Sequence, residues 1–289
     1  MKEPLFTGVC TALVTPFLDG KVNFPMVERL LQRQIDAGVH AVVLAGTTGE
    51  ASTLSDLEKI ELFKRCKEYV CDRCKIIAGT GTNSTEHTVA LSQAAKSVGV
   101  DGLLVVSPYY NKANADGLYL HYCAVANSVN IPVVIYNVPS RTGLDIPVSV
   151  YKRLSLLPNI AGVKEASTDI AKQLRTHATC GHNLPIWSGN DDQIVASMAL
   201  GGLGVISVIS NIMPEKAVAI TNAALNGDFK SAAALQCNLA ETIDLLFADV
   251  NPIPIKYAMG YIGFDCGACR PPLCAPPKEL QAKIQSHFQ

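Results

Sequence analysis

The sequence lacks an excess of either charge, and it lacks any hydrophobic run long enough to cross a membrane. Its 24 Lys and Arg residues are scattered among 25 Asp and Glu residues, so the net charge is −1. Nucleic acids and anionic membranes bind basic patches, and we therefore expect neither as a partner. The longest apolar runs, such as residues 203–209, have only the length of a strand. Residues 1–5 form no hydrophobic targeting segment, which predicts a cytoplasmic protein.

Two motifs that indicate other enzyme classes are also missing. A dinucleotide-binding sheet normally has a glycine-rich turn after its first strand. Here the first strand-like segment runs into Thr15-Pro16-Phe17, which cannot cradle a pyrophosphate. None of the six histidines lies in an H-E-x-x-H arrangement, so no histidine-based metal motif is recognisable.

Ten cysteines are many for a cytoplasmic enzyme. Most lie in apolar segments, as Cys10 and Cys66 do, where cysteine behaves as a small hydrophobic residue. Two pairs have C-x-x-C spacing, with a fifth cysteine nearby: Cys71/Cys74, Cys266/Cys269 and Cys274. A four-thiolate zinc site would have to join the two pairs. They lie far apart in the sequence and no local signal joins them, so we expect no metal site.

Eight apolar, strand-like segments alternate with amphipathic helical segments, and this pattern predicts the fold. The strands are expected at residues 9–15, 40–46, 75–79, 102–107, 132–137, 160–164, 184–188 and 204–209. Helical spacing of apolar residues predicts helices between them, for example at 26–37, 55–70, 85–98 and 115–128. Strands that are apolar on both faces indicate a parallel sheet, here closed into a (β/α)8 barrel. A doubly wound open sheet is the alternative fold.

Helix boundaries and the domain division are predicted as follows. Ser55 and Glu58 have the spacing of a capping box, and Thr85 and Ser149 are candidate helix starts.

Beyond the eighth strand the chain is helical in pattern, with a proline-rich break at 270–277. We expect a catalytic barrel at residues 1–224 and a small C-terminal helical domain at 225–289.

Polar residues follow most of the predicted strands, at the barrel end where active sites lie. They occupy residues 46–50, 107–111, 136–143 and 188–192. Many of them also have a simpler structural explanation. Thr47 and Thr48 could stabilise a turn, Tyr136 could pack in the core, and Arg141 could be a surface charge. Asp191 and Asp192 are expected to begin a helix. The gathering of so many polar groups at one rim nevertheless favours an active site.

Lys164 lies in an apolar strand near its carboxyl end. Strand alternation predicts that Ile160 and Gly162 share its face and that Glu165 points the other way. Burial disfavours the charged form of a lysine, and a neutral amine can attack a carbonyl to form a Schiff base. The alternative is a lysine that extends its ammonium group to the solvent at the rim. Lys75 begins a strand and is expected at the opposite, structural end.

Five motifs in this order resemble those of the dihydrodipicolinate synthase family: G-T-T-G-E at 46–50, P-Y-Y-N at 108–111, Y-N-V-P-S-R-T-G at 136–143, V-K-E-A at 163–166 and S-G-N-D at 188–191. The resemblance covers essentially the whole chain, including N-P-I-P-I-K at 251–256. The wider family consists of pyruvate-dependent class I lyases and includes N-acetylneuraminate lyase. Intact Thr47-Thr48 and the presence of Arg141 favour the synthase over the sialate enzymes.

The resemblance implies that the chain condenses pyruvate with L-aspartate-4-semialdehyde to give 4-hydroxy-tetrahydrodipicolinate, early in diaminopimelate and lysine biosynthesis. Lys164 would form the imine, and Tyr136 would act as general acid and base in a proton relay with Thr47 and Tyr110. The tyrosine that matches Tyr110 reaches into a neighbouring subunit in similar enzymes. The resemblance thus implies a homo-oligomer, at least a dimer, with a tetramer built from two dimers as the expected assembly.

The substrate-binding residues also follow from the resemblance. Thr48 and the backbone at Ile206 would hold the pyruvate carboxylate. Arg141 would bind the semialdehyde carboxylate, which suits the planar fork of a guanidinium group, and Gly189 would leave room close to the substrate. No metal, nucleotide or vitamin cofactor is implied, because Lys164 itself supplies the electron sink.

The chain departs from the pattern of relatives that are inhibited by lysine. Those relatives carry histidines on the helix after strand two and a glutamate on the helix after strand three, where this chain has Asp56, Lys59 and His87. A cationic Lys59 would repel a lysine effector. We expect weak or absent feedback inhibition, although Asn83 and Tyr109 remain.

Two other functions stay open at this point. One is a related pyruvate-dependent aldolase that acts on a sugar acid. The other is a catalytically inactive barrel that serves as a binding or regulatory protein, which the joint presence of Lys164, Tyr136, Thr47 and Tyr110 disfavours.

Overall fold

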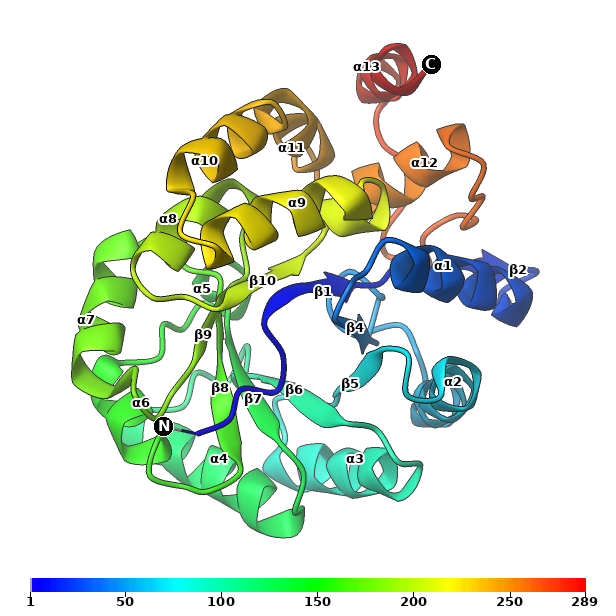
Figure 1. Ribbon diagram of the computed structural model, residues 1–289. Coiled ribbons are helices and arrows are strands. Elements are labelled where there is room, and N and C mark those ends of the chain that lie inside the picture. The colour runs from blue at the N-terminus through cyan, green and yellow to red at the C-terminus, as the bar shows by residue number, and fades with distance from the viewer. Residues whose placement is uncertain (1) are drawn as a thin grey trace.

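The computed structural model describes residues 2–289, and its centre is a closed barrel of eight parallel strands (Figure 1). The strands are β1 (Gly8–Ala12), β4 (Ala41–Leu44), β5 (Lys75–Gly79), β6 (Gly102–Val106), β7 (Val133–Asn137), β8 (Ile160–Glu165), β9 (Ile186–Ser188) and β10 (Gly204–Ser207). Because β1 pairs with both β10 and β4, the sheet has no free edge. The predicted (β/α)8 barrel is confirmed, and the doubly wound alternative is wrong.

Helices surround the strands and continue beyond them (Figure 1). The helices up to the last barrel helix are α1 (Phe24–Asp36), α2 (Asp56–Val70), α3 (Thr85–Ser97), α4 (Ala115–Ser128), α5 (Pro139–Thr142), α6 (Val148–Leu154), α7 (Ile170–Cys180), α8 (Ile194–Ala199) and α9 (Pro214–Leu225). They are followed by α10 (Phe229–Cys237), α11 (Ala240–Leu246), α12 (Ile253–Tyr261) and α13 (Lys278–Phe288). None of the helices described in residues 2–289 is long and apolar enough to cross a membrane.

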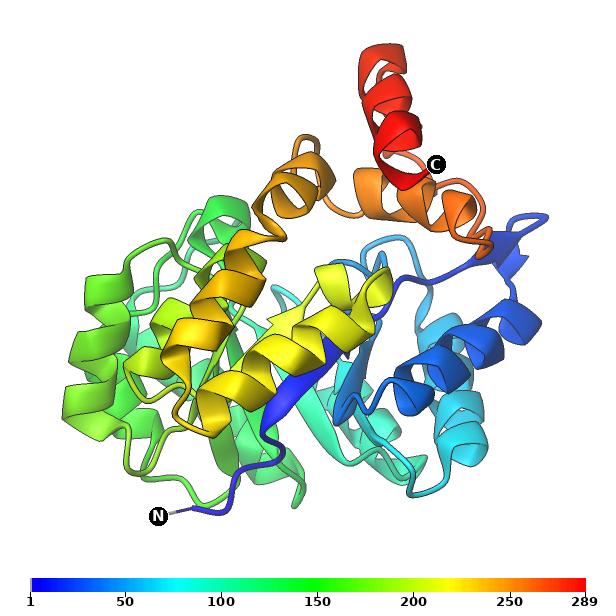
Figure 2. The ribbon, with the colours of Figure 1, turned by 45° about the horizontal axis from the view of Figure 1, so that its top comes forward.

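The C-terminal helices lie on the side of the barrel away from the N-terminus, as Figure 2 shows for α11, α12 and α13. A small antiparallel pair, β2 (Phe17–Leu18) and β3 (Lys21–Val22), lies next to this C-terminal segment. The backbone N–H of Phe17 donates to the carbonyl of Cys266, 2.9 Å away. Since Phe17 follows β1, the C-terminal segment contacts the carboxyl end of the barrel. The domain division at residues 224/225 stays a prediction.

Two hydrophobic layers hold the barrel together, one between strands and helices and one inside the ring of strands. The inner layer includes Cys10, Ile77, Trp187 and Ile206. The Phe6 ring stacks on Trp187 with centroids 4.8 Å apart. The interior is thus filled by side chains, as is usual for such barrels, whose active sites lie at the carboxyl ends of the strands.

Strand β8 deviates from strict alternation. Its pairing with β7 shifts register, because Val133 pairs with Ile160 while Val134 pairs with Gly162. As a consequence Ile160 packs in the outer layer, and Ala161 packs in the inner one. The prediction that Ile160 shares the face of Lys164 is therefore wrong, since a bulge reverses the alternation upstream of the lysine.

The predicted helix starts are partly right. Ser55 and Glu58 form the capping box at α2, with the Glu58 N–H 3.3 Å from Ser55 Oγ and the Ser55 N–H 2.9 Å from Glu58 Oε2. Thr85 is not the cap of α3, because Ser84 accepts the His87 N–H. Ser149 lies within α6, whose N-cap is Pro147.

Candidate active site

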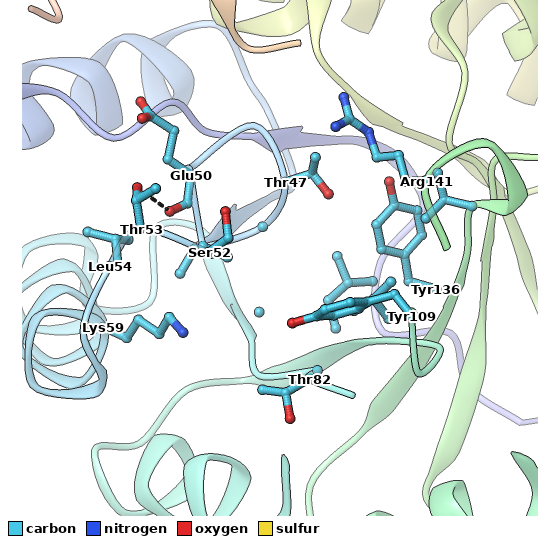
Figure 3. A pocket seen from close by; sticks show the side chains of 18 of the residues that line it. Thr47, Glu50, Ser52, Thr53, Leu54, Lys59, Thr82, Tyr109, Tyr136 and Arg141 are labelled. Atoms are coloured by element: carbon cyan, nitrogen blue, oxygen red, sulfur yellow. Dashed lines mark hydrogen bonds between the residues drawn. The ribbon is translucent and has the colours of Figure 1, made fainter. Parts of the chain in front are cut away.

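A cavity of about 530 Å3 opens at the carboxyl ends of the strands. Its walls come from the loop after β4, the start of α2, the ends of β5 to β7, and residues of the C-terminal segment such as Asn251 and Leu273. Among the predicted site residues, Thr47, Tyr136 and Arg141 line it. Figure 3 shows these three on one side of the cavity, with Lys59 on the opposite side. Parts of the predicted polar segments 46–50, 107–111 and 136–143 therefore share one cavity, whereas Lys164 and residues 188–192 are not among the residues that line it.

Lys164 lies next to Tyr136 on paired positions of β8 and β7. The side chains are in contact, since Lys164 Nζ lies 4.4 Å from the centroid of the Tyr136 ring. Lys164 is only 5% exposed, so its amine does not extend into bulk water as in the alternative reading. The lysine is thereby held dry against the aromatic ring that lines the cavity.

Glu165 points to the other side of β8, as predicted. Its carboxylate accepts hydrogen bonds from Asn137 Nδ2 at 2.7 Å, Tyr151 Oη at 3.0 Å and the Ser167 N–H at 2.9 Å. Lys172 Nζ lies 3.4 Å away and supplies a counter-charge. Glu165 is therefore fully engaged behind the barrel wall and fastens the end of the strand that carries the lysine.

The loop with Thr47 and Thr48 follows β4 and is closed by a turn in which the Glu50 N–H donates to the Thr47 carbonyl, 3.1 Å away. Thr48 is buried, and its Oγ1 accepts a hydrogen bond from Asn251 Nδ2 at 2.9 Å. Asn251 was not predicted as a site residue. Its only sequence signal is its place at the start of the N-P-I-P-I-K motif.

Arg141 lies on the short helix α5, directly after β7. Its Nη2 donates to the carbonyl oxygen of Asn251, 2.9 Å away. Asn251 therefore contacts Thr48 through its side chain and Arg141 through its backbone. One residue of the C-terminal segment thus connects two of the predicted substrate-binding residues.

Tyr110 is not brought to the cavity within this chain. It is 90% exposed, and its backbone is in the left-handed region with φ +72°. Its neighbour Tyr109 is one of the described residues that line the cavity, and Tyr110 is not. Nothing in the described contacts joins Tyr110 to Tyr136 of the same chain, and the expectation that Tyr110 serves a neighbouring subunit stays a prediction.

Gly189 and Ile206 lie on the neighbouring strand ends. A Cβ at Gly189 would lie 2.6 Å from Ala166 Cβ, so the glycine permits close contact between two strand ends. A larger residue at position 189 would clash with Ala166. The predicted role of Gly189, which is to leave room close to the substrate, stays a prediction. Ile206 is fully buried in the inner layer.

Asp191 does more than begin a helix. It does lie at the start of a short 3-10 helix (Asp191–Gln193), but it is buried, and its Oδ2 accepts the N–H groups of Val208 and Ile209, both at 2.9 Å. Burial raises the pKa of this carboxyl group. Its role in joining the ends of β9 and β10 was missed, since no local pattern distinguishes it from the exposed cap that was predicted.

Asp56, Lys59 and His87 also line the cavity, and Figure 3 shows Lys59 on the side opposite Tyr136. The Asp56 carboxylate lies 2.7 Å from His87 Nε2 and 3.8 Å from Lys59 Nζ. Burial lowers the pKa of Lys59, while Asp56 opposes this shift. The three side chains thus partner one another along this wall.

The two C-x-x-C pairs do not meet. Cys74 directly precedes β5 at the amino end of the barrel, whereas Cys266 contacts Phe17 at the carboxyl end. Within residues 2–289 no three His, Cys, Asp or Glu side chains are grouped as metal ligands would be. The four-thiolate arrangement considered above is therefore not formed.

Comparisons with known proteins agree with this geometry. The Dihydrodipicolinate synthetase family matches residues 5–289. The 4-hydroxy-tetrahydrodipicolinate synthase of Clostridium novyi (strain NT) is 45% identical over 270 residues, which cover 93% of this chain and 91% of that protein. The crystal structure of dihydrodipicolinate synthase from Aquifex aeolicus has a TM-score of 0.96 and 38% identity, covering 98% of this chain and 97% of its own.

A third similar protein is the enzyme from Cyanidioschyzon merolae, whose structure has lysine bound. It is 33% identical, has a TM-score of 0.95, and the match covers 99% of this chain and 98% of that one. Together with the family match over nearly the whole length, these similarities go well beyond a shared barrel fold. The chain belongs to the dihydrodipicolinate synthetase family.

Proposed function

We propose that this chain is a lyase that condenses pyruvate with L-aspartate-4-semialdehyde to give 4-hydroxy-tetrahydrodipicolinate, an early step of diaminopimelate and lysine biosynthesis. The observation that carries the proposal is the buried Lys164 amine, 4.4 Å from the centroid of the Tyr136 ring. A dry amine beside a phenol has the two groups that Schiff-base chemistry needs, a nucleophile and a proton carrier. The Clostridium novyi relative is named as the synthase of the same product, 4-hydroxy-tetrahydrodipicolinate.

In the proposed reaction, Lys164 attacks the ketone of pyruvate and water leaves as the imine forms. Loss of a proton from the pyruvate methyl group gives the enamine, whose carbon attacks the aldehyde of the second substrate. Tyr136 carries protons between these steps, and Thr47, which lines the same cavity, is its relay partner. The amino group of the semialdehyde then closes the ring and displaces Lys164.

Both substrates carry a carboxylate that must be held. For pyruvate we assign this task to Thr48 and to the backbone at Ile206. For the semialdehyde we assign it to Arg141, an exposed residue that lines the cavity and whose guanidinium donates to the Asn251 carbonyl. Gly189 keeps the nearby strand ends close together. The chemistry of Lys164 requires no separate cofactor.

Tyr110 completes the relay from a second copy of the chain in this proposal. Its 90% exposure supports the idea, because a tyrosine so exposed has no packing role in its own subunit. The minimal active unit is then a dimer, and we expect two dimers to form a tetramer. Mixing Tyr110→Ala with Lys164→Ala subunits should restore part of the activity that each lacks alone, since some hybrid sites contain both residues. Hybrids without any regained activity would contradict the shared site.

Borohydride trapping with pyruvate tests the function. Wild-type protein should gain a covalent adduct that peptide mass spectrometry locates at Lys164, and Lys164→Ala should gain none. Lys75→Ala is the matched control, because Lys75 is an exposed lysine at the amino end of β5 and should not affect labelling. Absence of an adduct in the wild type, or an adduct at another lysine, would overturn the proposal. We expect the enzyme in the cytoplasmic fraction of cells.

A sugar-acid aldolase is the second candidate, and Arg141 discriminates between the two. If semialdehyde turnover survives in Arg141→Ala while a sugar acid is the better substrate of the wild type, the aldolase assignment replaces the synthase.

A further inference from the structure

A buried ion pair lies directly behind the loop that carries Thr47 and Thr48. Lys256 Nζ is 2.7 Å from Glu50 Oε1, and the two side chains are 2% and 0% exposed. The other carboxylate oxygen, Oε2, accepts the backbone N–H of Arg270 at 2.8 Å. Lys256 lies on α12 and Arg270 on the segment before α13, so both donors come from the C-terminal segment.

The backbone of Glu50 is held as firmly as its side chain. Its N–H donates to Thr47, and its carbonyl accepts from the Thr53 N–H at 3.0 Å and from Thr53 Oγ1 at 3.1 Å. Its φ is +55°, a left-handed conformation that is uncommon for residues other than glycine. Such a conformation persists only when the surrounding contacts determine it.

Arg270 extends the same anchoring along the loop. Its guanidinium donates to the Thr53 carbonyl at 2.8 Å and to both oxygens of Glu58, at 3.0 and 2.6 Å. The C-terminal segment is therefore attached to Thr48, Glu50 and Thr53 in the loop between β4 and α2, and to Glu58 in the first turn of α2.

The Glu50 carboxylate points away from Tyr136 and Arg141, as Figure 3 shows, so it does not act on the substrates directly. A buried ion pair is also a poor way to gain stability, since well-packed apolar residues of similar size often do as well. The Glu50–Lys256 pair instead fixes the position of the Glu50 carboxylate, and thereby the conformation of the turn that contains Glu50.

We propose that Glu50, bound to Lys256 and Arg270, is a positioning residue that fixes Thr47 and Thr48 for pyruvate binding and proton transfer. This inference rests on the roles proposed above for the two threonines. It also makes α12 part of the active-site machinery, because Lys256 on α12 and Asn251 just before it act on the same short loop.

Removing both charges at once separates positioning from stability. A single Glu50→Gln change leaves the Lys256 charge buried without a counter-charge, since its remaining partner is the Ala268 carbonyl, and this is strongly destabilising. The double variant Glu50→Gln/Lys256→Met keeps the volume and leaves an acceptor for the Arg270 N–H. We expect a thermal midpoint near that of the wild type, but a KM for pyruvate raised about 10- to 100-fold, since small displacements of positioning groups have effects of this size.

The matched control is the Lys67–Asp101 pair, which is partly buried with 3.0 Å between Nζ and Oδ2. Asp101 accepts the N–H of Ile76 near the start of β5, so this pair lies at the opposite end of the barrel. Lys67→Met/Asp101→Asn should leave the KM for pyruvate unchanged. If both double variants show wild-type kinetics, Glu50 is only structural and the inference is overturned.

Glu50→Asp keeps the charge and decides the question if the double variant does not fold. It withdraws the carboxylate by one methylene group, and a folded Glu50→Asp protein should show the same raised KM for pyruvate. Wild-type kinetics in this variant would overturn the inference. A wrong proposed function gives a different result from a wrong role for Glu50. It would appear in the wild-type protein, as the absence of a trapped adduct at Lys164.

Discussion

Lys164 on β8 and Tyr136 on β7 are direct neighbours in the barrel wall, and the lysine Nζ lies over the tyrosine ring. Their proximity is set by strand pairing and not by a loop. Strand pairs in a closed sheet are held on both sides, so the distance between amine and phenol changes little as the cavity fills. This arrangement suits a site in which the same two groups act in successive steps.

Replacing Tyr136 with phenylalanine should separate imine formation from proton transfer. The ring stays against Lys164 while the hydroxyl is lost. We expect kcat to fall by about 10²- to 10⁴-fold, the usual contribution of a general acid or base. Trapping of pyruvate on Lys164 should still be detectable by mass spectrometry. Unchanged kcat in Tyr136→Phe would exclude the tyrosine as the proton carrier.

Arg141 should affect the second substrate more than the first. In Arg141→Lys the charge remains, but the planar fork that pairs with a carboxylate is gone. We expect the KM for L-aspartate-4-semialdehyde to rise about tenfold or more, which corresponds to at least about 1.4 kcal/mol of binding. The KM for pyruvate should change little. A larger rise in the KM for pyruvate than in the KM for the semialdehyde would contradict the assignment of Arg141 to the semialdehyde carboxylate.

L-Lysine should inhibit this enzyme weakly or not at all. Lys59 places a cation on the wall opposite Tyr136, and it would repel the ammonium groups of lysine. Half-inhibition below about 1 mM, roughly 4 kcal/mol of binding, would contradict this prediction. The variant Lys59→His/His87→Glu carries residue types of the inhibited relatives and should become more sensitive. Steady-state assays over a lysine titration measure both proteins.

Stability should fall as the pH decreases from about 6.5 to about 4, in part through His121. Burial lowers the pKa of this histidine to about 4 from 6.5, and its Nδ1 lies 3.0 Å from Thr85 Oγ1. Below pH 6.5 the unfolded chain takes up a proton that the folded chain still excludes. The free energy of unfolding should therefore decrease toward acid pH by up to about 1.4 kcal/mol per pH unit from this group.

Urea denaturation of the wild type and of His121→Gln over this pH range measures the effect. The variant should show a shallower decrease, because it lacks the titrating ring. Parallel curves for the two proteins would show that His121 does not contribute.

Local patterns in the sequence predicted the elements of the fold well, because each depends on neighbouring residues. The apolar segment 75–79 forms β5, and Ser55 and Glu58 form the predicted capping box of α2. The predictions were wrong where they depended on the exact position of a single residue. Ser84 and not Thr85 caps α3, and the bulge in β8 turned Ile160 outward. Both depend on contacts that a short window of sequence does not contain.

The sequence by itself determined the alternating barrel, the rim where its polar residues gather, and the placement of Lys164 on one side of its strand and Glu165 on the other. Only the tertiary structure decided that Asn251 contacts Thr48, 203 positions away, and that Lys256 pairs with Glu50 across 206 positions. It also decided that Tyr110 is 90% exposed and does not line the cavity of its own chain. The reason is physical: periodicity reports which side of an element is apolar, whereas a contact between distant segments exists only after the barrel has closed and brought them together.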